Sequence, residues 1–270
     1  MSSQLTVAAV QLTSTADVEA NLKRAIGWTR RAAEAGAQLI ALPENYGLLS
    51  REEDKLQYAQ SVETSDFVAP LREVAKTCQV YVLAGSIPEA GPDAGHAYNT
   101  SVLIGPDGTT IASYRKIHLF DVELADGSSF RESATVAAGH EPVVTRVADW
   151  PVGLSVCYDL RFPEVYRALV DKGARILMVP AAFTLHTGKD HWDLLLRARA
   201  VENLCFVVAP AQFGYHGNKR ASWGKTQIID PWGTPLSVVP EREGFALATL
   251  DAADQERCRA ELPCLGHRRL

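Results

Sequence analysis

Short apolar runs rich in β-branched residues recur along the whole chain and alternate with stretches of helical periodicity. Because these runs are apolar almost throughout rather than at every second position, they predict strands that are buried on both faces. The pattern indicates an α/β fold with helices covering the sheet. The runs occupy 5–12, 37–44, 80–87, 100–105, 109–117, 152–159, 174–183, 205–213 and 226–230.

Four stretches between these runs predict helices. Residues 17–35 place Val18, Leu22 and Ile26 on one stripe and end at an Ala-Gly pair, which is typical of a helix terminus. Residues 190–204 are rich in good helix formers. Helices are also expected over 65–77 and 163–172.

Two further segments predict β-hairpins, so we expect a mixed sheet. Residues 100–114 form two strand runs around Pro-Asp-Gly, and residues 226–239 repeat the device around Asp-Pro-Trp-Gly. No low-complexity segment or short repeat interrupts the pattern, which favours a single domain over 1–270. The least regular part is 119–142, and a connection of that length in a compact domain is usually functional.

Composition and charge exclude several classes of function. The chain is 47% hydrophobic with a formal net charge of −5 and has no long basic tract, so a nucleic-acid partner is not expected. No apolar run approaches the roughly 18 residues of a membrane span, and the N-terminus does not resemble a signal peptide. The odd number of cysteines and their irregular spacing favour reduced thiols and a cytoplasmic location. The cysteines are Cys78, Cys157, Cys205, Cys258 and Cys264.

The motifs of metal and nucleotide sites are missing from the sequence. His186 and His191 are five positions apart, which does not place them on one helix face, and no H-E-x-x-H occurs. Neither G-x-G-x-x-G nor the phosphate-binding loop motif is present. We therefore expect no metal and no cofactor.

Three ionisable residues stand where apolar runs stop. Glu44 ends the run 37–44, Lys116 lies near the end of 109–117, and Cys157 lies near the end of the run that starts at Val152. In α/β sheets, ligands gather beyond the carboxyl ends of strands, so the three groups are expected to share one pocket.

The chemistry of such a trio is acyl transfer to a thiol. The thiolate attacks a carbonyl or nitrile carbon, the carboxylate transfers protons, and the ammonium with a nearby backbone N–H stabilises the oxyanion. Pro163 suits the first turn of a helix, and the N-terminus of that helix is expected to favour the thiolate form of Cys157.

The segments LPENYG, YRKIHLFD and SVCYDLRFPE resemble the signature segments of the carbon–nitrogen hydrolase (nitrilase) superfamily. The resemblance implies a four-layer α-β-β-α sandwich that commonly forms homodimers or larger homo-oligomers. It also implies that Glu44 is the general base, Lys116 the oxyanion stabiliser and Cys157 the nucleophile. The segment FRES is similar to the one that carries a second, supporting glutamate, here Glu132.

Within the superfamily, CYDLRFPE, HWDLLLRARAVEN and KRASWGKTQIIDPWG are most similar to amidases that cleave deaminated glutathione to 2-oxoglutarate and Cys-Gly. This implies a small carboxylated amide as substrate. Three alternatives stay open: an omega-amidase that acts on 2-oxoglutaramate, a true nitrilase, and a non-catalytic binding module on the same scaffold.

Four more residues are candidates for substrate binding. A guanidinium at Arg161 can hold a substrate carboxylate, or it can pair with Asp159 or Glu164 and fix the turn after Cys157. Tyr46 and Tyr158 flank members of the trio and either line the pocket or pack beneath it. The fourth candidate is Phe183, expected as pocket wall, whereas Arg197 and Arg199 are expected to pair with carboxylates such as Glu202.

Overall fold

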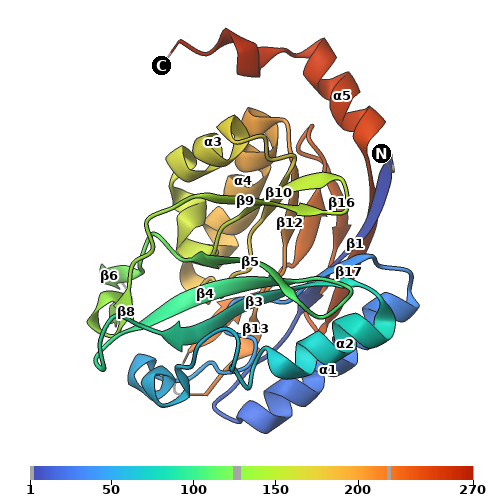
Figure 1. Cartoon of the computed structure of the whole chain (residues 1–270). Helices are drawn as coiled ribbons and strands as arrows, with labels where there is room; N and C mark the ends of the chain where they lie inside the picture. Colours follow the sequence, from blue (N-terminus) through green and yellow to red (C-terminus); the bar gives the residue numbers. More distant parts are fainter. Residues whose placement is uncertain (1–2, 124–128, 218–219, 270) are drawn as a thin grey trace.

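The computed structural model describes residues 3–123, 129–217 and 220–269 and forms four layers (Figure 1). Helices α1 (Val18–Glu34) and α2 (Ala69–Cys78) cover one side, and α3 (Pro163–Asp171) and α4 (Leu185–Asn203) cover the other. Two β-sheets lie face to face between them. The predicted α-β-β-α sandwich is confirmed.

The first sheet has the order β17-β1-β2-β3-β4-β5, with β8 paired to β4. Strands β1, β2 and β3 are parallel, whereas β17, β4 and β5 pair with their neighbours in antiparallel fashion. The strands are β17 (Gly244–Asp251), β1 (Gln4–Gln11), β2 (Leu39–Ala41), β3 (Tyr81–Ala90), β4 (Ala97–Ile104), β5 (Thr110–Arg115) and β8 (Val136–Ala137).

The second sheet repeats this arrangement with the order β16-β15-β12-β11-β10-β9. Its parallel strands β10, β11 and β12 are flanked by antiparallel partners on both sides. In both sheets the parallel strands are almost wholly buried, as their apolar runs predict. The strands are β16 (Pro235–Val238), β15 (Gln227–Ile229), β12 (Phe206–Ala209), β11 (Ile176–Met178), β10 (Trp150–Leu154) and β9 (Val143–Val147).

Two apolar clusters hold the layers together. One joins the facing sides of the two sheets and extends under α3 and α4, and the other joins the outer face of the first sheet to α1 and α2. Asp17 caps α1 by accepting a hydrogen bond from the N–H of Ala20 at 3.0 Å. Helix α4 begins at Leu185 rather than 190 because Thr184 provides its N-cap.

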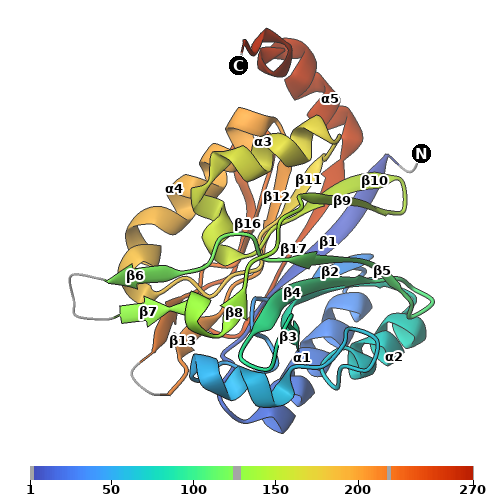
Figure 2. The same ribbon diagram turned by 60° about the vertical axis from the view of Figure 1, so that its left-hand side comes forward.

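The segment 119–142 is more regular than its sequence suggests. It contains the hairpin β6 (Asp121–Glu123) and β7 (Ser129–Arg131), the 3-10 helix η2 (Glu132–Ala134) and β8. The hairpin lies at the same end of the sandwich as β13 (Phe213–Tyr215) and its partner β14 (Ala221–Trp223), as Figure 2 shows. Periodicity also missed β9, β17 and the C-terminal elements, α5 (Ala252–Glu261) and η4 (Cys264–His267).

A helix of the length and apolarity needed to cross a membrane is absent from the described residues.

Gly85 allows the segment that carries Glu44 to lie against β3. A Cβ at Gly85 would stand 2.1 Å from the carbonyl oxygen of Pro43 and 2.2 Å from that of Leu42. The β3–β4 ladder shifts register between Ala84 and Ile87, and this irregularity lies beside the Glu44 segment. The close approach therefore depends on the missing side chain.

We expect Gly85→Ala to push this segment away from β3. The overpacking should lower the free energy of unfolding by about 2 kcal/mol or more, because the clashing atoms are backbone oxygens that cannot rotate away. Urea unfolding measures this change. The matched control is Gly27→Ala in α1, where the new Cβ would have no neighbour within 4 Å outside the helix's own backbone. This change should raise the free energy of unfolding by up to about 1 kcal/mol, because alanine favours the helix. Equal midpoints for the two variants would contradict the expectation.

Candidate active site

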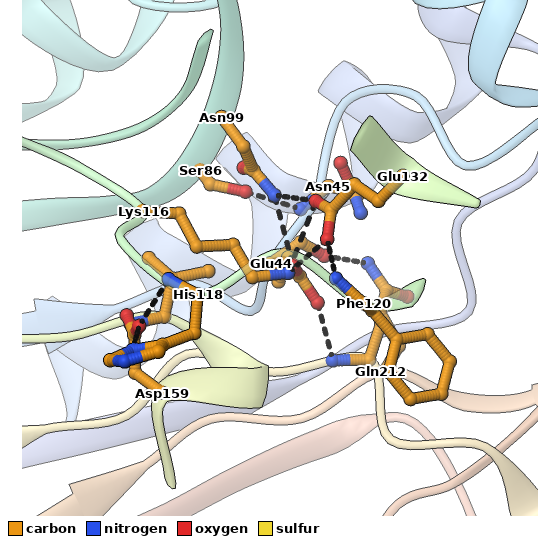
Figure 3. Close-up of polar contacts among 12 residues, drawn as sticks. Glu44, Asn45, Ser86, Asn99, Lys116, His118, Phe120, Glu132, Asp159 and Gln212 are labelled. Atoms are coloured by element: carbon orange, nitrogen blue, oxygen red, sulfur yellow. Dashed lines mark hydrogen bonds and ion pairs between the residues drawn. The ribbon is translucent and has the colours of Figure 1, made fainter. Parts of the chain in front are cut away.

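The three groups predicted from strand ends meet at one cavity of about 380 Å³. Glu44 follows β2, Lys116 follows β5 and Cys157 follows β10, and all three side chains are buried. The Lys116 ammonium donates to Glu44 Oε1 at 3.1 Å, and Cys157 lies close enough to the same carboxylate to help lower the pKa of Glu44. The structure thus brings a thiol, a carboxylate and an ammonium together at one place (Figure 3 shows the lysine and the carboxylates).

Cys157 lies at a sharp change of backbone direction. Strand β10 ends at Leu154, and Cys157 begins the 3-10 helix η3 (Cys157–Arg161) rather than ending the strand. Its φ of +49° is in the left-handed region that residues with a Cβ rarely adopt. The Cys157 N–H donates to the Pro180 carbonyl oxygen at 2.9 Å, so it is not free to bind an oxyanion. The fold holds this residue in a strained conformation.

Both carboxylate oxygens of Glu44 are held by donors. Oε1 accepts from the Asn99 side-chain amide at 3.0 Å as well as from Lys116, and Oε2 accepts from the Ala182 N–H at 3.0 Å. Burial by itself would raise the pKa of Glu44, but Lys116 and the hydrogen bonds outweigh it, so this pKa lies below its ordinary value. The carboxylate is therefore ionised and positioned at neutral pH.

The backbone around Glu44 is fixed from both halves of the chain. The Asn45 N–H donates to Ser86 Oγ at 3.0 Å, and the Gln212 side-chain amide donates to the Glu44 carbonyl oxygen at 3.0 Å (Figure 3). Ser86 belongs to β3 of the first sheet, whereas Gln212 follows β12 of the second. The position of Glu44 therefore depends on the packing of the two sheets.

Lys116 is held between two carboxylates. Its Nζ donates to Glu132 Oε2 at 2.8 Å and Oε1 at 3.1 Å, in addition to Glu44. Burial by itself would lower the pKa of Lys116, but Glu132 and Glu44 outweigh it and hold this pKa well above its ordinary value. Glu132 also accepts from the Phe120 N–H at 2.7 Å, which fixes the start of the 119–142 segment (Figure 3).

The resting protonation state of Cys157 differs from the expectation. Burial raises the pKa of the Cys157 thiol well above its ordinary value, the Glu44 carboxylate raises it further, and Lys116 opposes the shift without reversing it. The expected thiolate at a helix N-terminus is therefore wrong for the resting site, because loss of water and a neighbouring anion outweigh the helix end. Cys157 therefore rests as a thiol beside an ionised Glu44 carboxylate.

Asp159 connects the segments that carry Cys157 and Lys116. It is wholly buried and accepts from the Tyr114 hydroxyl at 2.7 Å, the Val156 N–H at 2.9 Å, and the His118 N–H and Nδ1 at 3.0 and 2.9 Å. Tyr114 and His118 flank Lys116, and Val156 precedes Cys157, so one carboxylate ties together two reactive segments. The sequence pattern offered Asp159 only as a partner for Arg161; the signal that could have identified it is its position two residues after Cys157.

Three of the four proposed substrate-binding residues line the cavity, and one does not. Tyr158, Arg161 and Phe183 belong to its wall. Tyr46 has no exposed surface, and its hydroxyl donates to the Phe67 carbonyl oxygen at 2.8 Å. Tyr46 therefore packs beneath the site and does not line the cavity; the sequence had left both placements open.

Arg161 has no ion pair with Asp159 or Glu164 among the residues that the structure describes. Its guanidinium lies over the rings of Phe183 and Tyr158, with Cζ 5.2 and 5.8 Å from the ring centroids, and Nη1 lies 3.3 Å from His191 Nδ1. The turn after Cys157 is instead held by Asp159. The Arg161 side chain thus remains available at the cavity wall.

The two arginines of α4 make structural contacts. Both pair with carboxylates, as predicted: Arg199 with Glu202 at 2.9 Å and Arg197 with Asp193 at 3.9 Å. Arg199 also donates to the Leu160 carbonyl oxygen, and Arg197 to the Gly233 carbonyl oxygen. Within the described ranges, no group of three or more His, Cys, Asp or Glu side chains is arranged to hold a metal ion.

The pattern of the family described as "Carbon-nitrogen hydrolase" matches residues 6–260. The chain is 46% identical over 264 residues to a deaminated glutathione amidase of Synechocystis, with 97% of each chain covered. It is 39% identical to the deaminated glutathione amidase of Homo sapiens, covering 97% of this chain and 82% of that one. The omega-amidase of Bos taurus is 35% identical, with 97% and 94% covered.

Solved structures share the fold at about 30% sequence identity. Saccharomyces cerevisiae Nit3, described as a member of the nitrilase superfamily, superposes with a TM-score of 0.90 at 31% identity and covers 100% of this chain and 98% of its own. An amidase from Nesterenkonia, in which acrylamide has added to the active-site cysteine, superposes with a TM-score of 0.79 at 29% identity, covering 96% and 98%. The chain belongs to the carbon–nitrogen hydrolase family and is a hydrolase of carbon–nitrogen bonds other than peptide bonds.

Proposed function

We propose that the protein is an amidase that hydrolyses deaminated glutathione to 2-oxoglutarate and Cys-Gly through a thioester on Cys157. The observation that carries this proposal is the gathering of Cys157, Glu44 and Lys116 at one cavity. The relatives named deaminated glutathione amidase, at 46% and 39% identity, support the choice of substrate.

The resting charges support a specific order of proton transfers. Glu44 accepts the thiol proton as Cys157 Sγ attacks the amide carbon, and Lys116 stabilises the negative charge on the carbonyl oxygen. Glu44 then gives the proton to the leaving nitrogen, and the C–N bond breaks. Glu44 next removes a proton from water as the water oxygen attacks the thioester carbon. The C–S bond then breaks, and Glu44 returns the proton to the sulfur, which restores the thiol. Glu132 supports the lysine throughout.

Omega-amidase activity on 2-oxoglutaramate is the second candidate. The bovine omega-amidase at 35% identity supports it, and the mechanism is the same. The two substrates share the 2-oxo acid half, for which Arg161 offers an available guanidinium. They differ in the amine half, which is Cys-Gly in one and ammonia in the other, so a release assay on both substrates and on a simple nitrile compares the candidates directly.

We expect Cys157→Ala to lower kcat on any amide by at least about 10⁴-fold, because the variant lacks the nucleophile while removing little volume. Thermal unfolding should be close to that of the parent, and release of 2-oxoglutarate measures activity. The control is Cys264→Ala, in the C-terminal η4, which should keep full activity. Substantial hydrolysis by Cys157→Ala would disprove the assignment and favour a binding module or another nucleophile.

We expect Arg161→Ala to raise KM about thirtyfold for both 2-oxo acid amides, because it removes a charge-assisted contact in a partly desolvated pocket. An uncharged amide should be hydrolysed with unchanged KM, and steady-state kinetics on both kinds of substrate measure the difference. Equal losses on charged and uncharged amides, confined to kcat, would mean that Arg161 acts only on the geometry of the turn.

The homodimer and the cytoplasmic location stay predictions. Leu194 and Val201 on one face of α4 and Trp232 in the β15–β16 turn are large, apolar and exposed, and we propose that a second copy of the chain covers them. Sedimentation equilibrium should give twice the mass of one chain, and Leu194→Glu should give the mass of one. A wild-type monomer at micromolar concentration would contradict this proposal.

A further inference from the structure

The cavity contains a second group of charged side chains that the mechanism does not use. Lys55 Nζ lies 2.6 Å from Glu52 Oε2, and Arg220 Nη1 lies 3.3 Å from Glu52 Oε1. Lys55 and Glu52 come from the 3-10 helix η1 (Glu52–Tyr58), and Arg220 precedes β14. All three residues line the cavity, and we call them the basic triplet.

The basic triplet has one positive charge in excess. Lys55 and Arg220 share the single carboxylate of Glu52; burial by itself would raise the pKa of Glu52, but the two cations lower it to about 2, so this carboxylate is ionised at neutral pH. In the described part of the chain, Arg220 Nε is buried without a hydrogen-bond partner. A bound anion would balance the charge and satisfy this donor.

His216 adds an unpaired acceptor to the same part of the cavity. Its side chain is 5% exposed and lines the cavity, and its Nδ1 lies 2.8 Å from the Ser14 carbonyl oxygen. Because a carbonyl oxygen only accepts, Nδ1 carries the proton, and burial lowers the pKa of His216 to about 4, which keeps the ring neutral. Nε2 is then an acceptor, and it is buried with no partner among the described residues.

An aromatic wall separates the basic triplet from Arg161. Arg220 Cζ lies 5.7 Å from the centroid of Phe130, which lies 5.2 Å from Phe120, and Phe120 lies 5.0 Å from Tyr158. Arg161 Cζ lies 5.8 Å from the Tyr158 centroid at the other end of this row. The cavity therefore has a cationic group at each end of its aromatic wall.

The basic triplet also lies close to the reacting groups. Lys55 contributes to lowering the pKa of Glu44, and Lys116 contributes to lowering that of Glu52. Charge–charge interactions weaken with distance, so the basic triplet lies near the trio of Glu44, Lys116 and Cys157. A ligand in this cavity can therefore contact both groups.

We propose that the basic triplet and His216 bind the amine half of the substrate. Arg220 and Lys55 hold a carboxylate on that half, and His216 Nε2 accepts a hydrogen bond from its N–H or S–H group. The inference rests on the proposed function, because Cys157 must cleave an amide whose acid half is held by Arg161. It assigns the substrate class as amides of an amino acid or short peptide with a free carboxylate, such as Cys-Gly.

The test compares two substrates that share the acid half. Arg220→Gln should lower kcat/KM for deaminated glutathione about thirtyfold, because a charge-assisted contact is lost, and should change that for 2-oxoglutaramate less than twofold. The matched control is Arg51→Gln, at the cavity rim, where the arginine is exposed and pairs with Asp54. Arg51→Gln should change kcat/KM for each substrate less than threefold. That result would exclude a general effect of losing a positive charge at the cavity rim.

A substrate variant makes the test independent of protein folding. Deaminated glutathione with its glycine carboxylate converted to a carboxamide should be hydrolysed by the wild-type enzyme about thirtyfold less efficiently than the parent compound. Arg220→Gln should discriminate between the two compounds several-fold less than the wild-type enzyme does, since the two changes remove one shared contact and only that of Lys55 remains. Additive losses in this cycle would overturn the proposal.

The outcomes distinguish this inference from the proposed function. If the wild-type enzyme hydrolyses 2-oxoglutaramate but not deaminated glutathione, the proposed substrate is wrong and the subsite is wrong with it. If the enzyme hydrolyses deaminated glutathione and its carboxamide equally well, only the subsite is wrong. Equal losses on deaminated glutathione and 2-oxoglutaramate in Arg220→Gln would also overturn it, because they would place Arg220 with the acid half or in a structural role.

Discussion

The site depends on a buried ammonium held between two buried carboxylates. Lys116 is 2% exposed and contacts Glu44 and Glu132, and none of the three charges could be buried without the others. Breaking a buried pair of this kind by removing one partner typically costs about 3–5 kcal/mol, because the remaining charge stays out of water. Asn99 reinforces the arrangement by donating to both carboxylates. The cluster therefore fixes the protonation states from which the chemistry starts.

This cluster requires that both sheets keep a fixed relation to one another. Glu44 and Lys116 extend from the first sheet and Cys157 from the second, and Asp159 joins the turn at Cys157 to the residues that flank Lys116. The apolar cluster between the sheets supplies the rigidity, and these polar contacts set the register of the reactive atoms. Cys157 rests as a thiol beside the ionised Glu44, and the inter-sheet contacts keep these two groups together.

The distribution of charge along the cavity indicates which kind of ligand fits it. The group formed by Glu44, Glu132 and Lys116 has one negative charge in excess, whereas Arg161 and the basic triplet each have one positive charge in excess. Neutralising groups at two separate places suit a ligand with a carboxylate at each end and an amide between them. In the function that we propose, the ends of the cavity select the amide and its centre carries out the reaction.

The sequence by itself indicated the buried strands and the helices between them, and it placed Glu44, Lys116 and Cys157 at strand ends, because apolar runs and strand ends are local features; the family resemblance added the four layers. The tertiary structure decided how these parts interact. It placed Tyr46 in the core, gave Cys157 a positive φ and a resting thiol, and folded part of 119–142 into a hairpin. It alone brought Arg220 to Glu52 and Asn99 to Glu44. Such contacts join positions far apart in the chain, and protonation depends on burial and neighbouring charges, which no local pattern of residues encodes.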